Sequence, residues 1–384
     1  MRTQVGIVGA GPAGLATSRE LGRAGIRHVV LERGESIAHT WTRLYDGLVL
    51  HTGKHLSALP GLPFPASTPL FPARTDFLEY LERYASTFEL PVTCGADVTS
   101  VRRDDDRWNV ALADGRSLTT HAVVIATGIV STPHVPEFPH RARFTGRVIH
   151  SVEYRRPQPF AGERVLVVGA GNSSGEISAE LADAGAHVTV SIRSGARVVP
   201  RQIFGIPIQY VGAALRHVPQ RWLVRVMSVT GGLAKWIRGA PALPPAVDSP
   251  CSTVPLIGFH LVDGVKSGRI QLATGVSEFT PDGMRFLDGS EQRFDSVILA
   301  TGYRATLHML GPEIARDRCG FANRRDRVVS ADAPGLYFVG HNFDVAGALR
   351  NIAQDARIAA RFIAAQLNDA AGRDTDTPQR RNER

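Results

Sequence analysis

Residues 5–14 read VGIVGAGPAG, and this stretch is the clearest indication of the fold in the sequence. An apolar strand leads into Gly9-x-Gly11-x-x-Gly14, and the pattern predicts a helix over residues 12–25. Gly9 permits the tight turn, Gly11 lets the backbone approach a pyrophosphate, and Gly14 lets helix and strand pack closely. The free N–H groups and the positive end of the helix dipole would face the phosphates. The stretch therefore predicts a Rossmann-like dinucleotide-binding unit.

The next expected strand, residues 28–32, ends in an acid, Glu32. Glu32 lies 21 residues after Gly11, where a carboxylate can accept hydrogen bonds from the ribose hydroxyls of a dinucleotide. The same carboxylate would repel a 2′-phosphate. This first site is therefore predicted to take FAD or NAD and not NADP.

A second copy of the unit occurs at residues 165–175, which read VLVVGAGNSSG. Gly169 and Gly171 stand where the first two glycines stood, and Ser174 replaces the third. Serine is small enough to be tolerated at this close approach of helix and strand. The chain is therefore predicted to hold two dinucleotide sites.

In the second unit the next expected strand is residues 187–192. It is followed by Arg193-Ser194, and no acid stands at this place. A guanidinium can bind a phosphate through two parallel hydrogen bonds, so Arg193 indicates NADPH. Arg201 is a second candidate for the same phosphate. An acid-terminated site followed by a base-terminated site indicates FAD plus NADPH, with hydride passing from the nicotinamide to the flavin.

A strand that ends in Ala-Thr-Gly also occurs twice, at residues 126–128 and 300–302. Each dinucleotide motif is thus followed by its own Ala-Thr-Gly strand, which predicts an α/β fold of two Rossmann-like domains in a glutathione-reductase-like architecture. The predicted boundaries are residues 1–155 and 295–367 for a discontinuous FAD-binding domain, 160–294 for an inserted NADPH-binding domain, and 368–384 for a disordered tail.

The composition excludes several classes of protein. The 384 residues are 43% apolar and 21% charged, as in a globular chain. The net charge of +8 comes from basic residues scattered among acids, so no nucleic-acid partner is expected. No apolar stretch approaches the ~20 residues of a membrane span, and no signal peptide is expected. Cys94, Cys251 and Cys319 are isolated, so we expect no disulfide framework, no metal site, no dithiol redox pair and a cytoplasmic location.

Three further segments carry local predictions. The proline-rich residues 52–75 predict a loop-rich excursion, and residues 76–86 predict an amphipathic helix with Asp76 as its N-cap. The apolar side of that helix would hold Phe77, Leu78, Leu81 and Tyr84. The apolar segment 221–237 is interrupted by charges and glycines, which favours a core or cleft-facing helix over a membrane anchor.

Residues 144–154, between the two predicted domains, read FTGRVIHSVEY. This FxGxxxHSxxY pattern resembles the identifying motif of class B flavin-dependent monooxygenases, the flavin-containing monooxygenase family. The resemblance covers almost the whole chain, including WTRLYD at 41–46, VPRQIFG at 199–205 and GLYFVG at 335–340, and is greatest to the YUCCA-type indole-3-pyruvate monooxygenases. The related Baeyer–Villiger motif ends in Trp or Phe followed by Pro or Asp, whereas this chain has Tyr154-Arg155.

The resemblance implies an enzyme in which NADPH reduces FAD and the reduced flavin forms a C4a-hydroperoxyflavin with O2. One oxygen atom then passes to a small organic substrate, which is an amine, a sulfide or a 2-oxo acid such as an aryl-pyruvate. The cofactor carries the chemistry, so the protein needs no nucleophile or metal of its own. An NADPH-dependent flavin reductase or dehydrogenase without oxygen transfer, and a catalytically silent FAD-binding protein, remain alternatives. A homodimer is one expectation for the oligomeric state.

The candidate catalytic residues are Asn172, at the second dinucleotide turn, and His51, in the expected surroundings of the flavin. The expected FAD-binding residues are Gly9, Gly11, Pro12, Ala13, Gly14, Glu32, Arg33, Thr40, Trp41, His51, Thr52, Val98, Ala126, Thr127, Gly128 and Gly340. The expected NADPH-binding residues are Gly169, Gly171, Asn172, Ser173, Ser174, Arg193, Ser194, Arg201, Thr301 and Gly302.

Overall fold

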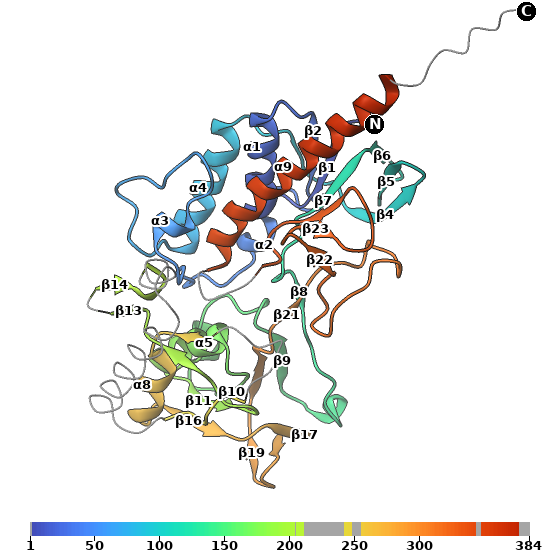
Figure 1. Ribbon diagram of the computed structural model, residues 1–384. Helices are drawn as coiled ribbons and strands as arrows, with labels where there is room; N and C mark the ends of the chain where they lie inside the picture. Colours follow the sequence, from blue (N-terminus) through green and yellow to red (C-terminus); the bar gives the residue numbers. More distant parts are fainter. Residues whose placement is uncertain (1, 204, 211–241, 248–254, 343–346, 376–384) are drawn as a thin grey trace, which may run out of the picture.

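The computed structural model describes residues 2–203, 205–210, 242–247, 255–342 and 347–375 (Figure 1). The segment 221–237, predicted to be a core or cleft-facing helix, lies outside the described residues. The described chain forms two sheets, each with helices on one face and a small antiparallel sheet on the other. We call the part built on the larger sheet the first domain and the part built on the smaller sheet the second domain.

The seven-stranded sheet of the first domain joins segments from both ends of the chain. The first strand, β1, pairs in parallel with β2 and β7, and a strand near the C-terminus, β24, pairs in parallel with β7. This pairing agrees with the predicted interleaving of the domains, whose exact boundaries stay a prediction. Across the sheet the strands are β22 (Arg324–Arg325), β23 (Val329–Ser330), β24 (Leu336–Phe338), β7 (Ala122–Ile125), β1 (Val5–Val8), β2 (His28–Leu31) and β3 (Val92–Thr93).

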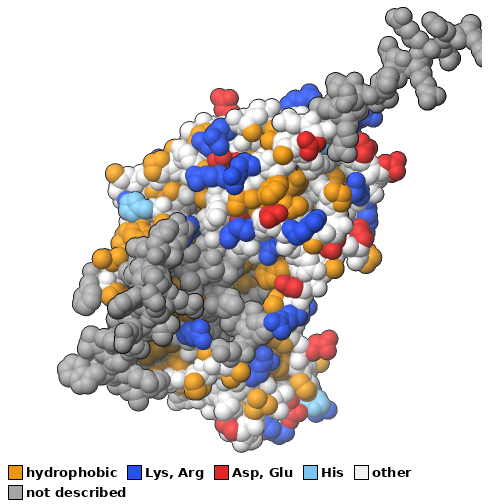
Figure 2. All heavy atoms as spheres, in the orientation of Figure 1, with side chains coloured by type: hydrophobic (Ala, Val, Ile, Leu, Met, Phe, Trp, Pro, Cys, Tyr) orange, Lys and Arg blue, Asp and Glu red, His pale blue; other side chains and the backbone are white. Residues whose placement is uncertain are grey.

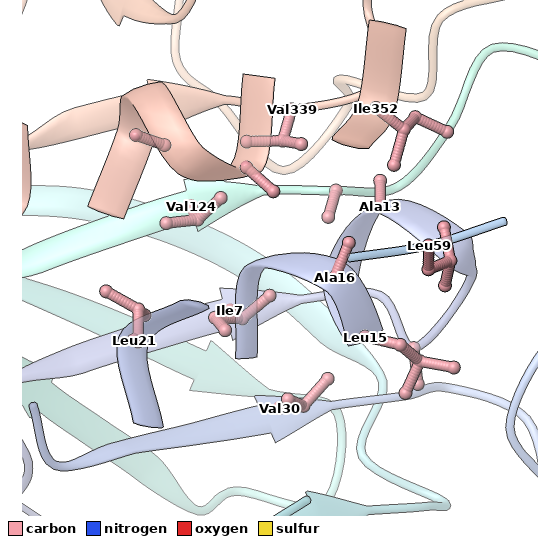
Figure 3. Packing of buried hydrophobic residues seen from close by; sticks show 14 of the residues in the cluster. Ile7, Ala13, Leu15, Ala16, Leu21, Val30, Leu59, Val124, Val339 and Ile352 are labelled. Atoms are coloured by element: carbon pink, nitrogen blue, oxygen red, sulfur yellow. The ribbon is translucent and has the colours of Figure 1, made fainter. Parts of the chain in front are cut away.

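Three helices cover one face of this sheet: α1 (Pro12–Arg23), α4 (Arg74–Thr87) and α9 (Ala348–Thr375). Helix α9 lies beside α1, so the last helix of the chain packs on the first (Figure 1). Their apolar side chains interdigitate over the strands; Figure 3 shows Ile7, Ala13, Leu15, Ala16, Leu21, Val30, Leu59, Val124, Val339 and Ile352 in this core. The meander β4 (Val98–Asp104), β5 (Arg107–Leu112) and β6 (Ser117–Thr120) packs on the opposite face.

The second domain holds a five-stranded, all-parallel sheet. Helices α5 (Asn172–Asp183) and α8 (His260–Lys266) cover one face, and the meander β17 (Val276–Thr280), β18 (Gly283–Phe286) and β19 (Glu291–Arg293) covers the other. Its strands are buried on both faces, which is why they read as continuous apolar runs. In order, the strands are β16 (Ile270–Ala273), β11 (His187–Ser191), β10 (Arg164–Val168), β20 (Ser296–Leu299) and β9 (Arg147–His150).

The remaining elements are short and connect these layers. The helices α2 and α3 precede the long loop before α4, and the short strands form the pairs β8–β21, β12–β15 and β13–β14. They are α2 (His39–Thr42), α3 (Lys54–Ser57), β8 (Thr132–Pro133), β12 (Val198–Val199), β13 (Gln202–Ile203), β14 (Ile206–Pro207), β15 (Leu256–Ile257), β21 (Tyr303–Arg304) and the 3-10 turns Arg141–Arg143 and Gln158–Phe160.

The two glycine motifs form the same turn in both domains. Gly9 has φ +103°, and a Cβ there would lie 2.6 Å from the carbonyl oxygen of Ala126. Gly169 has φ +131°, and a Cβ there would lie 2.3 Å from the carbonyl oxygen of Ala300. Each motif therefore packs its first glycine against its own Ala-Thr-Gly strand, as the repeat in the sequence predicts. Ser174, in place of the third glycine of the second motif, donates its hydroxyl to the carbonyl of Gly169 at 2.7 Å.

Three local predictions need correction. Asp76 is not the N-cap of α4: the helix begins at Arg74, and the Asp76 carboxylate accepts a hydrogen bond from the backbone N–H of Ala73 at 2.8 Å. Helix α9 continues through Thr375, so a disordered tail from residue 368 is wrong for residues 368–375. Cys319 takes part in a disulfide bond, which the spacing of the three cysteines did not indicate.

On the face that Figure 2 shows, lysine and arginine side chains are spread among acidic ones. Several of the arginines form ion pairs: Arg74 and Arg155 both bind Asp46, and Arg164 binds Asp295 at 2.7 Å. These arginines are thus offset locally by acids, as the scattered sequence pattern indicates.

Candidate active site

A cavity of about 350 Å³ lies at the carboxyl ends of β1, β2 and β7 and reaches the second domain. Dinucleotides bind at this edge of open parallel sheets, because the glycine turns and helix N-termini gather there. All but two of the residues predicted for FAD line the cavity. They are Gly9, Gly11, Pro12, Ala13, Glu32, Arg33, Thr40, Trp41, His51, Val98, Ala126, Thr127, Gly128 and Gly340.

The wall of this cavity fits an adenine dinucleotide. No atom lies within 4 Å of a Cβ built on Gly11, so the space in front of its backbone is open for a pyrophosphate. Glu32 is buried, and its carboxylate accepts hydrogen bonds from the N–H groups of Ala10 at 2.8 Å and Gly34 at 2.9 Å. These bonds hold the acid at the end of β2, where it faces the cavity beside Arg33.

Two residues predicted for FAD do not line the cavity. A Cβ on Gly14 would lie 1.8 Å from the carbonyl oxygen of Gly9, so this glycine serves the packing of helix on strand. Thr52 is buried beneath the cavity, and its carbonyl accepts the Ser57 hydroxyl at 2.9 Å. Neither residue faces the cavity, and both belong to the packing of the first domain.

The second glycine turn faces the same cavity from the other domain. Ser173, at the start of α5, is one of the lining residues. The space in front of Gly171 is open, as it is at Gly11. A nicotinamide dinucleotide held on α5 would therefore extend toward the cavity of the first domain.

Arg193 and Ser194 are exposed at the end of β11. Arg304 pairs with Thr132, two residues before His134. Burial lowers the pKa of His134, and the positive charges of Arg304 and Arg193 lower it further. The second Ala-Thr-Gly turn adjoins them, because Thr301 donates its hydroxyl to the His134 carbonyl. Such a cluster of guanidinium groups fits a phosphate monoester. The sequence interpretation missed Arg304, for which the only signal was its place directly after the second Ala-Thr-Gly-Tyr.

The motif at residues 144–154 contains β9 of the second domain. His150, at the end of β9, accepts a hydrogen bond from the Val152 N–H at Nδ1, and its Nε2 donates to the Gly302 carbonyl at 3.1 Å. Its ring packs edge-on against Tyr303, with 5.1 Å between the ring centroids. Burial lowers the pKa of His150, which favours the neutral ring that this bonding requires. His150 is therefore a structural residue that positions the second Ala-Thr-Gly turn.

Hydroxyl groups join the first Ala-Thr-Gly turn and the residues after it to Thr306. Thr127 donates to the Thr306 carbonyl at 2.7 Å, and the Thr306 hydroxyl lies 2.7 Å from that of Ser131 and 2.6 Å from that of Thr132. Ser131 and Thr306 line the cavity together with Tyr303. Sequence analysis missed Ser131, Tyr303 and Thr306, because no motif marks residues that meet only after the domains pack.

Comparison with known proteins identifies the family. The sequence model of the family "Pyridine nucleotide-disulphide oxidoreductase" matches residues 6–202. Indole-3-pyruvate monooxygenase YUCCA1 of Oryza sativa subsp. japonica is 38% identical over 311 residues, which cover 78% of this chain and 77% of that protein. Indole-3-pyruvate monooxygenase YUCCA4 of the same plant is 36% identical over 389 residues, which cover 94% of this chain and 88% of that protein. The chain belongs to the class B flavin-dependent monooxygenases.

Solved structures agree with this family. A flavin-containing monooxygenase from Stenotrophomonas maltophilia superposes with a TM-score of 0.76 at 26% identity, covering 95% of this monooxygenase and 99% of that chain. A bacillithiol disulfide reductase from Staphylococcus aureus superposes with a TM-score of 0.72 at 18% identity, a likeness that concerns the fold alone. The protein is thus an NADPH-dependent flavin monooxygenase with two dinucleotide-binding domains, and its cofactors are FAD and NADPH.

Two predicted residues of the monooxygenase lie elsewhere than expected. The amide of Asn172 donates to the Pro255 carbonyl and accepts from the Ile257 N–H at 2.7 Å, so it ties α5 to β15 and does not line the cavity. Arg201 donates to the Leu50 carbonyl at 3.0 Å, and its guanidinium lies 3.9 Å from the ring centre of Phe71. These contacts turn Arg201 toward the first domain.

His51 lines the cavity as predicted, and the structure adds a partner that the sequence did not indicate. Its Nε2 lies 2.6 Å from the carboxylate of Glu176 on α5, which also accepts the hydroxyl of Tyr45. Tyr45 lines the cavity as well. Among the described residues, no group of acids, histidines and cysteines could hold a metal ion. No helix in the described part of the chain is long and apolar enough to cross a membrane.

Proposed function

We propose that this monooxygenase acts on an aromatic 2-oxo acid of the aryl-pyruvate class. The observation that carries the proposal is the identity of 34–38% to plant relatives named indole-3-pyruvate monooxygenases. The wall of the cavity supports it, because Trp41, Leu48 and Ile352 offer apolar surface to an aromatic ring. Tyr45 and His51 offer hydrogen-bonding groups to a polar head group at the same cavity.

The proposed reaction inserts one oxygen atom of O2 between the carbonyl carbon and the carboxylate of the substrate. The bond to the carboxylate breaks, CO2 leaves, and an aryl-acetate remains, while the second oxygen atom becomes water. NADPH supplies the two electrons, and FAD supplies the reaction of those electrons with O2. The residues of the chain bind and orient the reactants and exclude water, so that electrons do not escape as peroxide.

We also propose the roles of individual residues. The cavity-lining residues predicted for FAD hold that cofactor, with Glu32 toward the ribose hydroxyls. Arg193 binds the 2′-phosphate of NADPH, and Arg304 adds a second guanidinium. The domain boundaries, a cytoplasmic location and a homodimer also remain predictions.

The test is a comparison of substrate classes by oxygen-dependent NADPH consumption, with hydrogen peroxide measured separately. Indole-3-pyruvate and phenylpyruvate are the 2-oxo acids, and a tertiary amine and a dialkyl sulfide are the alternatives. The proposal expects aryl-acetate and CO2 in amounts close to the NADPH consumed. Oxygenated amine or sulfide without aryl-acetate would favour the other substrate classes. Peroxide equal to NADPH with every compound would contradict the proposed substrate.

A further inference from the structure

Residues 44–51 form one wall of the flavin cavity, and we call them the wall segment. Tyr45, Leu48 and His51 of this segment all line the cavity. The segment holds no strand or helix, so its position depends on what its side chains and backbone contact. Such a wall needs partners to keep its shape.

Residues 72–74 of the first domain pair with the backbone of Leu48 and Leu50. The other partners come from the second domain. Arg201 donates to the Leu50 carbonyl at 3.0 Å, and the Gln209 amide donates to the His51 carbonyl at 3.1 Å. Both of these bonds end on the backbone of the wall segment. Glu176 is different, because it binds side chains that line the cavity.

Glu176 lies on α5, one turn after Ser173, and its side chain is 16% exposed. One carboxylate oxygen accepts the hydroxyl of Tyr45, and the other lies 2.6 Å from Nε2 of His51. A single carboxylate of the second domain therefore holds two side chains of the first domain at once. Each oxygen has its own donor, so neither bond replaces the other.

The surroundings keep this carboxylate ionised. Burial alone would raise the pKa of Glu176, but the hydrogen bonds and charge of His51, with Tyr45 and Arg201, hold it below its usual value. Glu180, one turn further along α5, accepts the hydroxyl of Tyr154 at 2.9 Å, and burial raises its pKa. Glu176 and Glu180, on the same helix, each accept a tyrosine hydroxyl, but Tyr154, the partner of Glu180, does not line the cavity.

We propose that Glu176 is a positioning residue that fastens Tyr45 and His51 across the domain junction and so keeps water out of the flavin cavity. When the second domain is docked, both donors are satisfied and the wall is closed. Without the carboxylate, the buried Tyr45 hydroxyl loses its acceptor, and a buried donor without an acceptor draws in water. Water at the reduced flavin lets electrons leave as peroxide.

The test uses the FAD-loaded enzyme in air with NADPH and no substrate, so it does not depend on the proposed substrate. Glu176→Gln keeps the shape but accepts only one of the two donors. We expect peroxide release per bound FAD to rise about fivefold or more. The KM for NADPH and the anaerobic rate of FAD reduction should stay within about twofold, because Glu176 binds Tyr45 and His51 and not the arginines proposed for the phosphate.

Two further variants make the result specific. Glu180→Gln removes a neighbouring carboxylate from the same helix and should leave peroxide release at the level of the unmodified enzyme. Tyr45→Phe should raise peroxide release. Its combination with Glu176→Gln should raise peroxide release by less than the sum of the two single effects, because the bond between Tyr45 and Glu176 is common to both variants. Unchanged peroxide release in Glu176→Gln, an equal rise in Glu180→Gln, or fully additive effects would each overturn the proposal.

Discussion

Gly11 and Gly14 both belong to the first dinucleotide motif, but they are glycines for different physical reasons. A Cβ on Gly14 would lie 1.8 Å from the Gly9 carbonyl oxygen, whereas a Cβ on Gly11 meets no protein atom within 4 Å. Gly14→Ala should therefore destabilise the protein itself, by about 2 kcal/mol or more. Gly11→Ala should fold normally and lose FAD, because its methyl group occupies the space of the pyrophosphate.

Melting curves of the FAD-free protein and the FAD content after purification separate these two effects. We expect a lowered melting temperature for Gly14→Ala only, and a lowered FAD content for both variants. Equal melting temperatures of the two FAD-free variants would contradict the packing argument.

We expect Arg193 to determine the preference of the enzyme for NADPH over NADH. Its guanidinium is exposed at the end of β11 near Arg304 and His134. A charge-assisted contact contributes about 1.5–3 kcal/mol, so Arg193→Ala should raise the KM for NADPH roughly 10- to 150-fold. The KM for NADH should change little, because NADH has no 2′-phosphate.

The matched control is Arg103→Ala, which removes an exposed arginine of β4 in the other domain. Steady-state kinetics of all three proteins with both coenzymes give the comparison. An unchanged preference for NADPH in Arg193→Ala, or the same loss in Arg103→Ala, would assign the phosphate to other residues.

At the scale of elements, α9 contributes to stability although it is the last helix of the chain. Ile363 is fully buried where α9 packs on α1, and its neighbour Phe362 is 39% exposed. Ile363→Ala should lower the free energy of unfolding by about 3 kcal/mol, because it leaves a cavity in the core. Phe362→Ala, a larger deletion at the surface, should cost less than about 1 kcal/mol. Urea denaturation of both variants measures the difference, and equal shifts of the midpoint would contradict the packing of α9 on α1.

Elements whose residues follow one another in a recognisable motif could be predicted from the sequence. Contacts between segments far apart in the sequence could not. The glycine turns, their strands and the acid at Glu32 lie within one continuous stretch, so their spacing alone indicates the site. The contacts of Arg201 and Asn172 were missed, because a neighbouring loop satisfies each side chain and no spacing records that loop. The end of α9 was placed too early, since a polar helical stretch and a disordered tail have similar compositions.

At the scale of the whole molecule, the first domain is built from both ends of the chain: β24 and α9 pack in the domain that β1 begins. The repeat of both motifs was enough to predict the two domains, because each copy is a complete strand-turn-helix unit. The junction between them was not predictable, since Tyr303, Thr306 and Glu176 meet the first domain only after both have folded. The glycine turns could therefore be predicted from the sequence, whereas the contacts that Tyr303, Thr306 and Glu176 make at the junction could not.

The central claim is that NADPH oxidation drives the transfer of one oxygen atom from O2 to an aromatic 2-oxo acid. The most direct measurement is the mass of the organic product after turnover with NADPH and indole-3-pyruvate under isotopically heavy O2. We expect an aryl-acetate that carries one heavy oxygen atom, formed in proportion to the NADPH consumed. An unlabelled product, or peroxide that accounts for all of the NADPH, would contradict it.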